Sequence, residues 1–132
     1  MYEGYLLKVG INVIPFEYMR ADTYKATYNG QDIDSYRDAD GLLHRNALPH
    51  FVPKVEFNTP HITNAQAQAL LGLIRSQYLD TVEKKVSVKC YIPELDDYLT
   101  QDMYIPDIEF QIFKADGNDI IYNETRIAFI GY

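Results

Sequence analysis

Hydrophobic and polar residues alternate along two stretches of the chain. In residues 85–92 the odd positions are mostly polar and the even positions are Val86, Val88, Cys90 and Ile92. This period of two is typical of a half-buried strand, so the pattern predicts a strand over 85–92 that stops before Pro93. Residues 52–57 alternate in the same way, with Val55 and Phe57 facing inward and Lys54 and Glu56 outward.

A different period marks one helix, which we predict from Thr63 to Leu79. Thr63 and Gln66 form a capping-box signature, and Pro60 excludes an earlier start. The positions that recur at helical spacing are apolar: Ala67, Leu70, Leu71, Ile74 and Tyr78. A single amphipathic helix in a chain rich in strands must bury such a stripe against a sheet.

Further strands follow from shorter patterns. We expect them at Tyr5–Val9, Thr23–Tyr28, Asp102–Ile105, Ile108–Phe113 and Tyr122–Ile130, with a turn at Asp116-Gly117-Asn118. The fold class is therefore α+β and mostly β: a β-sandwich or curled antiparallel sheet with one packed amphipathic helix. No internal repeat or linker divides residues 1–132, and we expect one structural domain.

A polar segment interrupts this pattern between Asn29 and His50. About twenty residues without a predicted element are unusual inside a compact domain, and such loops tend to be functional, disordered or extended. We therefore expect a long loop or arm at about residues 29–50.

Charge narrows the classes of partner. The net charge is −7, and residues 93–124 carry most of it. Its acidic residues are Glu94, Asp96, Asp97, Asp102, Asp107, Glu109, Asp116, Asp119 and Glu124, offset by Lys114 alone. Such a surface repels phosphate backbones, so we expect no sequence-specific nucleic acid as a partner. A solvated acidic flank that aids solubility is the simplest interpretation.

Cysteine usage and hydropathy point to the place of synthesis. The one cysteine, Cys90, cannot form an internal disulfide, and no signal peptide is recognisable. No apolar run approaches the roughly 20 residues of a membrane helix. We expect synthesis in the host cytoplasm and no membrane partner. Twelve tyrosines and six phenylalanines without tryptophan suit half-buried strands and protein interfaces.

No catalytic or metal-binding motif is recognisable. The three histidines, at positions 44, 50 and 61, lack metal-ligand spacing. Aligning Gly41 with the invariant glycine of a calcium loop puts Tyr36 and Ala47 at ligand positions, so Asp38–Gly41 is more simply a turn. Cys90 faces inward on its strand and should be an inert thiol. We expect no enzyme, no cofactor and no metal.

The polar segment also carries a resemblance. The run from Asp34 to Arg45, Asp-Ser-Tyr-Arg-Asp-Ala-Asp-Gly-Leu-Leu-His-Arg, resembles a stretch of short structural tail proteins of siphophages and Gram-positive prophages. The opening Val9-Gly10-Ile11-Asn12-Val13-Ile14-Pro15 and the closing strands resemble the same family in order along the chain. Residues 93–99 fit its pattern least.

The resemblance implies a tail-tube-like fold and a structural role near the tail tube or the tail tip. Partners would be the protein itself, in a ring that is a hexamer or a trimer, and other tail proteins. Localisation would be the virion tail. In such a ring, an acidic lumen would let DNA slide without binding.

If the polar segment is an assembly arm, its apolar side chains anchor it and its charges set its register against a neighbour. The predicted interface consists of Tyr36, Arg37, Asp38, Asp40, Leu42, Leu43, His44 and Arg45. Two other classes stay open. One is a tail-associated carbohydrate- or receptor-binding module, which exposed tyrosines around an acidic pocket would favour. The other is a small acidic phage protein that binds a host protein.

Overall fold

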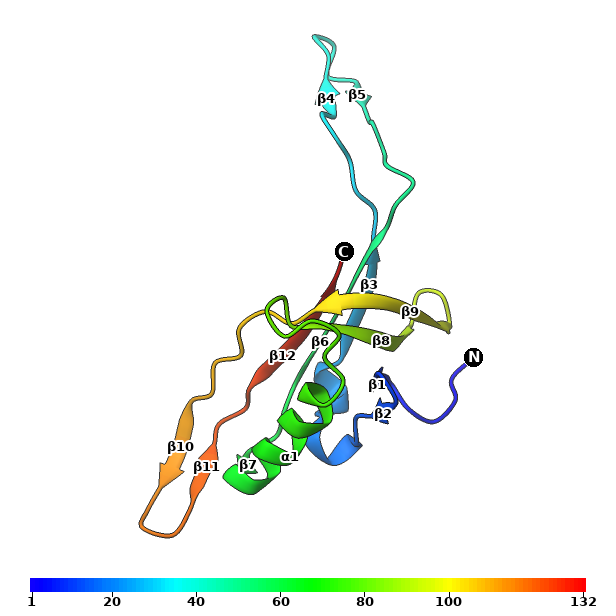
Figure 1. Cartoon of the computed structure of the whole chain (residues 1–132). Coiled ribbons are helices and arrows are strands. Elements are labelled where there is room, and N and C mark those ends of the chain that lie inside the picture. The colour runs from blue at the N-terminus through cyan, green and yellow to red at the C-terminus, as the bar shows by residue number, and fades with distance from the viewer.

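The computed structural model describes residues 1–132 and is built around one antiparallel sheet of seven strands (Figure 1). Their order across the sheet is β2-β1-β8-β9-β12-β6-β3. The strands are β1 (Leu7–Val9), β2 (Asn12–Val13), β3 (Lys25–Asn29), β6 (Val52–Asn58), β8 (Lys85–Ile92), β9 (Asp97–Tyr104) and β12 (Arg126–Gly131). Every neighbouring pair is antiparallel, as the sequence predicts.

The sheet curls, so that strands distant in its order approach one another. Tyr24, just before β3, donates its hydroxyl to the carbonyl oxygens of Leu6, at 3.2 Å, and Tyr91, at 2.7 Å. Leu6 precedes β1 and Tyr91 lies in β8, four places from β3 in the sheet. Of the two predicted architectures, the curled antiparallel sheet is therefore the one observed.

The concave side of the sheet holds the core, and helix α1 (Asn64–Arg75) covers it. Leu70 and Ile74 of the helix stripe belong to the same buried cluster as the inward residues of the strands. The predicted alternation is confirmed in β8, where Val86, Val88, Cys90 and Ile92 are fully buried. In β6, Val55 and Phe57 are likewise buried.

Two hairpins project from this domain in opposite directions (Figure 1). One joins β3 to β6 and carries β4 (Tyr36–Arg37) and β5 (Leu43–His44) near its tip. The other consists of β10 (Ile112–Ala115) and β11 (Ile120–Tyr122), and it pairs with β7 (Ile62–Thr63) beside the helix. Two short 3₁₀ helices, Phe16–Tyr18 and Ala21–Thr23, connect β2 to β3.

The predicted helix begins correctly but ends early. Thr63 is the N-cap, and the full capping box with Gln66 is present. The helix stops at Arg75 rather than Leu79, because the chain turns back there: the Leu79 amide donates to the carbonyl of Lys85, at the start of β8. Periodicity alone did not reveal this reversal, because Tyr78 still lies partly buried against the core.

The strand predicted at Asp102–Ile105 is wrong in its start. The observed β9 begins at Asp97, since it pairs along its whole length with β8 through a turn at residues 93–96. Its first residues are exposed and acidic, so they carry no hydrophobic signal. Hydrogen bonding to β8 extends the strand.

The last two strand predictions also need correction. Residues 105–111 are extended but belong to no strand, and β10 starts only at Ile112. The single long strand at Tyr122–Ile130 is instead β11 and β12, separated at residues 123–125. The buried pair of Thr59 and Thr125 fixes this break, since each backbone amide donates to the other residue, at 2.8 and 3.1 Å.

Candidate functional site

The longer hairpin, residues 30–51, forms an arm without a single buried residue. Its base is closed by the rings of Tyr28 and Phe51, whose centroids lie 4.7 Å apart. Further out, Asp32 and Ala47 form an isolated bridge. The segment that the sequence left without structure is thus a β-hairpin that extends well beyond the sheet (Figure 1).

Polar contacts within the arm give it its shape. The Arg45 guanidinium donates to both carboxylate oxygens of Asp32, at 2.8 and 3.1 Å. At the tip, Asp38 Oδ1 accepts the backbone amides of Asp40 and Leu42, each at 3.0 Å. These contacts complete the predicted turn over Asp38–Gly41, in which Gly41 has a φ of +83° that suits glycine.

The charges of the arm respond to these partners. Hydrogen bonding to Arg45 lowers the pKa of Asp32 below its usual value. A hydrogen bond with the His44 ring, followed by the Leu42 and Asp40 amides, likewise lowers the pKa of Asp38. Both carboxylates are therefore ionised at neutral pH, and both are satisfied inside the arm.

The eight residues of the predicted interface all lie in the outer part of this arm. Tyr36 stacks on the His44 ring with centroids 4.8 Å apart, and the Arg37 guanidinium donates to the Gly41 carbonyl. Leu42 and Leu43 are 64% and 43% exposed, with nothing in the chain to cover them. Unlike Asp38 and Arg45, the Asp40 carboxylate has no ion-pair or hydrogen-bond partner. In all, six large apolar side chains of the arm are exposed: Ile33, Tyr36, Leu42, Leu43, Leu48 and Phe51.

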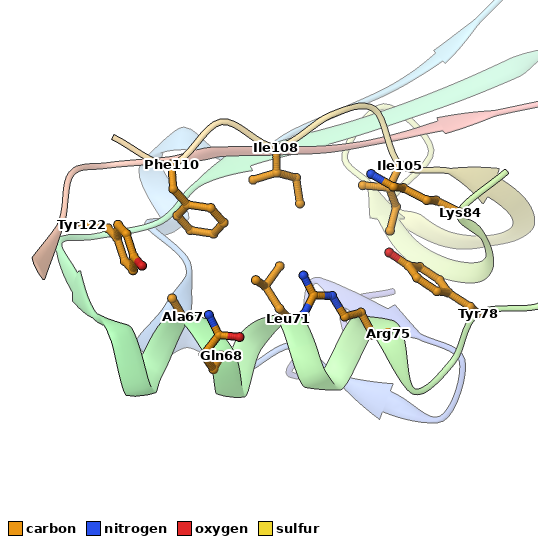
Figure 2. A pocket seen from close by; sticks show the side chains of 10 residues that line it. All are labelled: Ala67, Gln68, Leu71, Arg75, Tyr78, Lys84, Ile105, Ile108, Phe110 and Tyr122. Carbon is orange, nitrogen blue, oxygen red and sulfur yellow. The ribbon is translucent and has the colours of Figure 1, made fainter. Parts of the chain in front are cut away.

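A groove lies away from the arm, between α1 and the extended segment 105–110 (Figure 2). Its volume is about 410 Å³. Leu71 forms the helix side, and Ile105, Ile108 and Phe110 form the opposite wall, with Tyr122 closing one end. The groove is thus mainly apolar and open to solvent.

Two cations stand at the groove. Arg75, from the last turn of α1, points toward the opposite wall and has no acidic partner (Figure 2). Lys84 approaches Asp107 at 3.7 Å, but the Asp107 side chain is 98% exposed and this pair is weak. The sequence prediction missed this groove, because the alternation of Ile108 and Phe110 suggested one face of a strand.

A third feature is a cluster of tyrosines near the N-terminus. Tyr5 stacks on Tyr98 with centroids 4.8 Å apart, Tyr91 packs edge-on to Tyr98, and Lys89 lies over both stacked rings. The Tyr98 hydroxyl also donates to the Tyr5 carbonyl at 2.5 Å. These rings contact each other and attach the N-terminal segment to the β8–β9 hairpin, rather than lining an acidic pocket.

The remaining candidate chemistry is dispersed. Burial raises the pKa of Cys90 to about 12, which keeps the thiol protonated at neutral pH. No group of His, Cys, Asp and Glu side chains is arranged to hold a metal ion. No helix of the structure has the length and apolar character needed to cross a membrane. The acidic residues of 93–124 are spread over two hairpin turns and the segment between them, so they form no single face.

Solved structures share this fold over the whole chain. One is a chain in the tail of an empty gene transfer agent (GTA) particle, computed with helical refinement and C6 symmetry. The match covers 100% of this chain and 96% of that chain, with a TM-score of 0.55 and 12% identity. A second is a chain in the virion of a native gene transfer agent particle, with the same coverage, a TM-score of 0.50 and 14% identity. At these identities the likeness establishes the fold, which is mostly β with one helix, as in a tail-particle chain.

Sequence comparison gives a family. No curated protein matches this chain. A family model does, and it spans residues 1–132. The chain belongs to that family, which is described as a family of unknown function (DUF6711).

Proposed function

We propose that the protein is a structural protein of a phage or prophage tail, and that it assembles with itself or with neighbouring tail proteins near the tail tube or the tail tip. The observation that carries the proposal is the whole-chain fold likeness to a chain of a helical, six-fold symmetric tail. The site of synthesis would be the host cytoplasm, and the finished protein would reside in the virion tail.

The arm supports this role physically. Its six exposed apolar side chains have no partner in the chain, yet its turn and its ion pairs keep it in a defined hairpin. A pre-ordered hairpin loses less conformational entropy on binding than a disordered loop does. The interface predicted at Tyr36 to Arg45 therefore remains the first surface to test.

Structural proteins need no catalytic centre, and the chemistry of this chain is consistent with that. Cys90 is buried with a raised pKa, and the histidines pair with Asp38, with Asn123 and with a backbone carbonyl. The tyrosine cluster does not favour the carbohydrate-binding alternative, because its ring faces are occupied by one another.

The test is the solution mass of the full chain over a wide range of concentration, by light scattering, with electron microscopy of the largest species. The proposal expects rings or tubes of defined size. A matched pair of variants assigns the surface: Leu42→Ser in the arm should weaken assembly, whereas Ile11→Ser, 79% exposed in the β1–β2 turn, should not. A strict monomer that also fails to bind phage tails would overturn the proposal.

A further inference from the structure

The groove between α1 and residues 105–110 is an apolar surface that nothing in the chain covers. Its volume, about 410 Å³, falls in the range of roughly 300–1,000 Å³ that is typical of binding pockets. A cavity of that size, open on one side and lined by isoleucine, leucine and phenylalanine, exposes apolar area to water at a free-energy cost unless a partner fills it.

Charge narrows the occupant. Arg75 points into the groove without an acidic partner, and Lys84 is engaged only by the exposed Asp107. An occupant that is apolar and carries a carboxylate would satisfy both the walls and the cation. The arm tip presents this combination, since Leu42 is 64% exposed and the nearby Asp40 carboxylate has no partner.

Spacing agrees with charge. Leu71 and Arg75 are four residues apart on α1, so they are neighbours on one helix face. Asp40 and Leu42 are two residues apart, which limits their Cα separation to about 7 Å. An acidic and an apolar side chain of the arm can therefore meet a cationic and an apolar side chain of the groove at the same time.

The arm cannot reach the groove of its own chain. It leaves the sheet at one end of the molecule, while α1 and the β10–β11 hairpin lie toward the other end (Figure 1). We infer that the arm tip of one copy docks in the groove of a second copy, with Leu42 against the apolar walls and Asp40 beside Arg75. This inference rests on the proposed function and specifies its contact. Such a head-to-tail contact leaves a free arm and a free groove on every pair, so it repeats along an assembly.

Charge reversal provides the first test, on the full chain. Asp40→Arg and Arg75→Glu should each raise the concentration needed for assembly by about tenfold or more, since each places like charges together. An equimolar mixture of the two variants should assemble again, because each arm then meets a groove of opposite charge. Glu94→Arg and Lys114→Glu, equal charge changes on other exposed positions, should assemble as the unchanged protein does.

Cross-linking provides a second readout that does not need large assemblies. Asp40→Cys mixed with Arg75→Cys should form a mixed disulfide, and the buried Cys90 should stay out of the reaction. If the chain assembles but neither charge reversal matters and no cross-link forms, the docking inference fails and the proposed function stands. If the unchanged chain neither assembles nor cross-links, both fail. Uptake of an apolar ligand in place of the arm would also overturn the docking inference.

Discussion

The curled domain and the arm are built on opposite principles, although the same two strands run through both. Within the domain, β3 and β6 pack their inward residues into a core of sixteen buried side chains. Beyond Asn29 and Val52 the two chains continue as the arm, where no residue is buried and polar contacts alone define the shape. The domain therefore stabilises itself, while the arm leaves its apolar surface for something else to cover.

The largest difference should appear when one substitution is made in each region. Leu70→Ala removes a fully buried side chain beneath α1, and we expect it to lower the free energy of unfolding by about 2.7–5 kcal/mol. Leu42→Ala in the arm should change it by less than about 0.5 kcal/mol. Denaturant unfolding of both variants measures this, and similar losses at the two positions would contradict the comparison.

The helix cap provides a smaller effect inside the domain. Thr63→Ala removes the side-chain oxygen that accepts the Gln66 amide, so we expect a loss of about 1 kcal/mol. Because α1 covers the core, the loss should appear equally in far-ultraviolet circular dichroism and in tyrosine fluorescence. Separate transitions for the two probes would show that the helix unfolds apart from the sheet.

Removing the arm should cost the domain less still. Asn29 and Val52 are paired across β3 and β6, so replacing residues 30–51 with Asn-Gly joins them by a two-residue hairpin turn. We expect the free energy of unfolding to change by less than about 1 kcal/mol, since only the Tyr28–Phe51 contact is lost from the base. A shortened chain that fails to fold would show that the arm supports the domain.

The smallest effect is a local pH dependence at the arm tip. The pKa of Asp38 lies below its ordinary value of 3.8, because its ionised form bonds to His44 and to two backbone amides. The order this carboxylate gives to the turn is therefore present above about pH 4 and is lost as the pH falls through the lowered pKa. Amide signals of Asp40 and Leu42, followed by NMR, should shift in that window, and those of β8 should not. Asp38→Asn should abolish the pH dependence, and a shift that persists in this variant would count against the assignment.

Much of this contrast was predictable from local patterns. The alternation in residues 85–92 and 52–57 identified β8 and β6 with their buried faces, and Thr63 identified the start of α1. These features are encoded by neighbouring residues, because strand pleat and helix pitch place side chains at fixed periods. The long polar segment was identified as a loop or arm for the complementary reason, since it lacks either period.

What the sequence did not reveal depends on residues far apart along the chain. The early start of β9 comes from pairing with β8, and the break between β11 and β12 comes from Thr59 meeting Thr125. The groove is of the same kind, because Arg75 and Ile108 come together only when the helix packs beside an extended segment. Ile108 and Phe110 show the alternation of a strand, yet what they pack beside is a helix.

The sequence by itself determined a mostly β chain with one capped helix, an inward-facing unreactive cysteine, and a polar segment too long to be a simple turn. The tertiary structure alone decided that the sheet curls, that the polar segment stands out as a hairpin, and that an apolar groove with an unpaired arginine faces away from it. The reason is the range of the forces involved. Propensity and side-chain period act over a few residues, whereas backbone pairing and the sharing of a buried surface act between segments that meet only after folding.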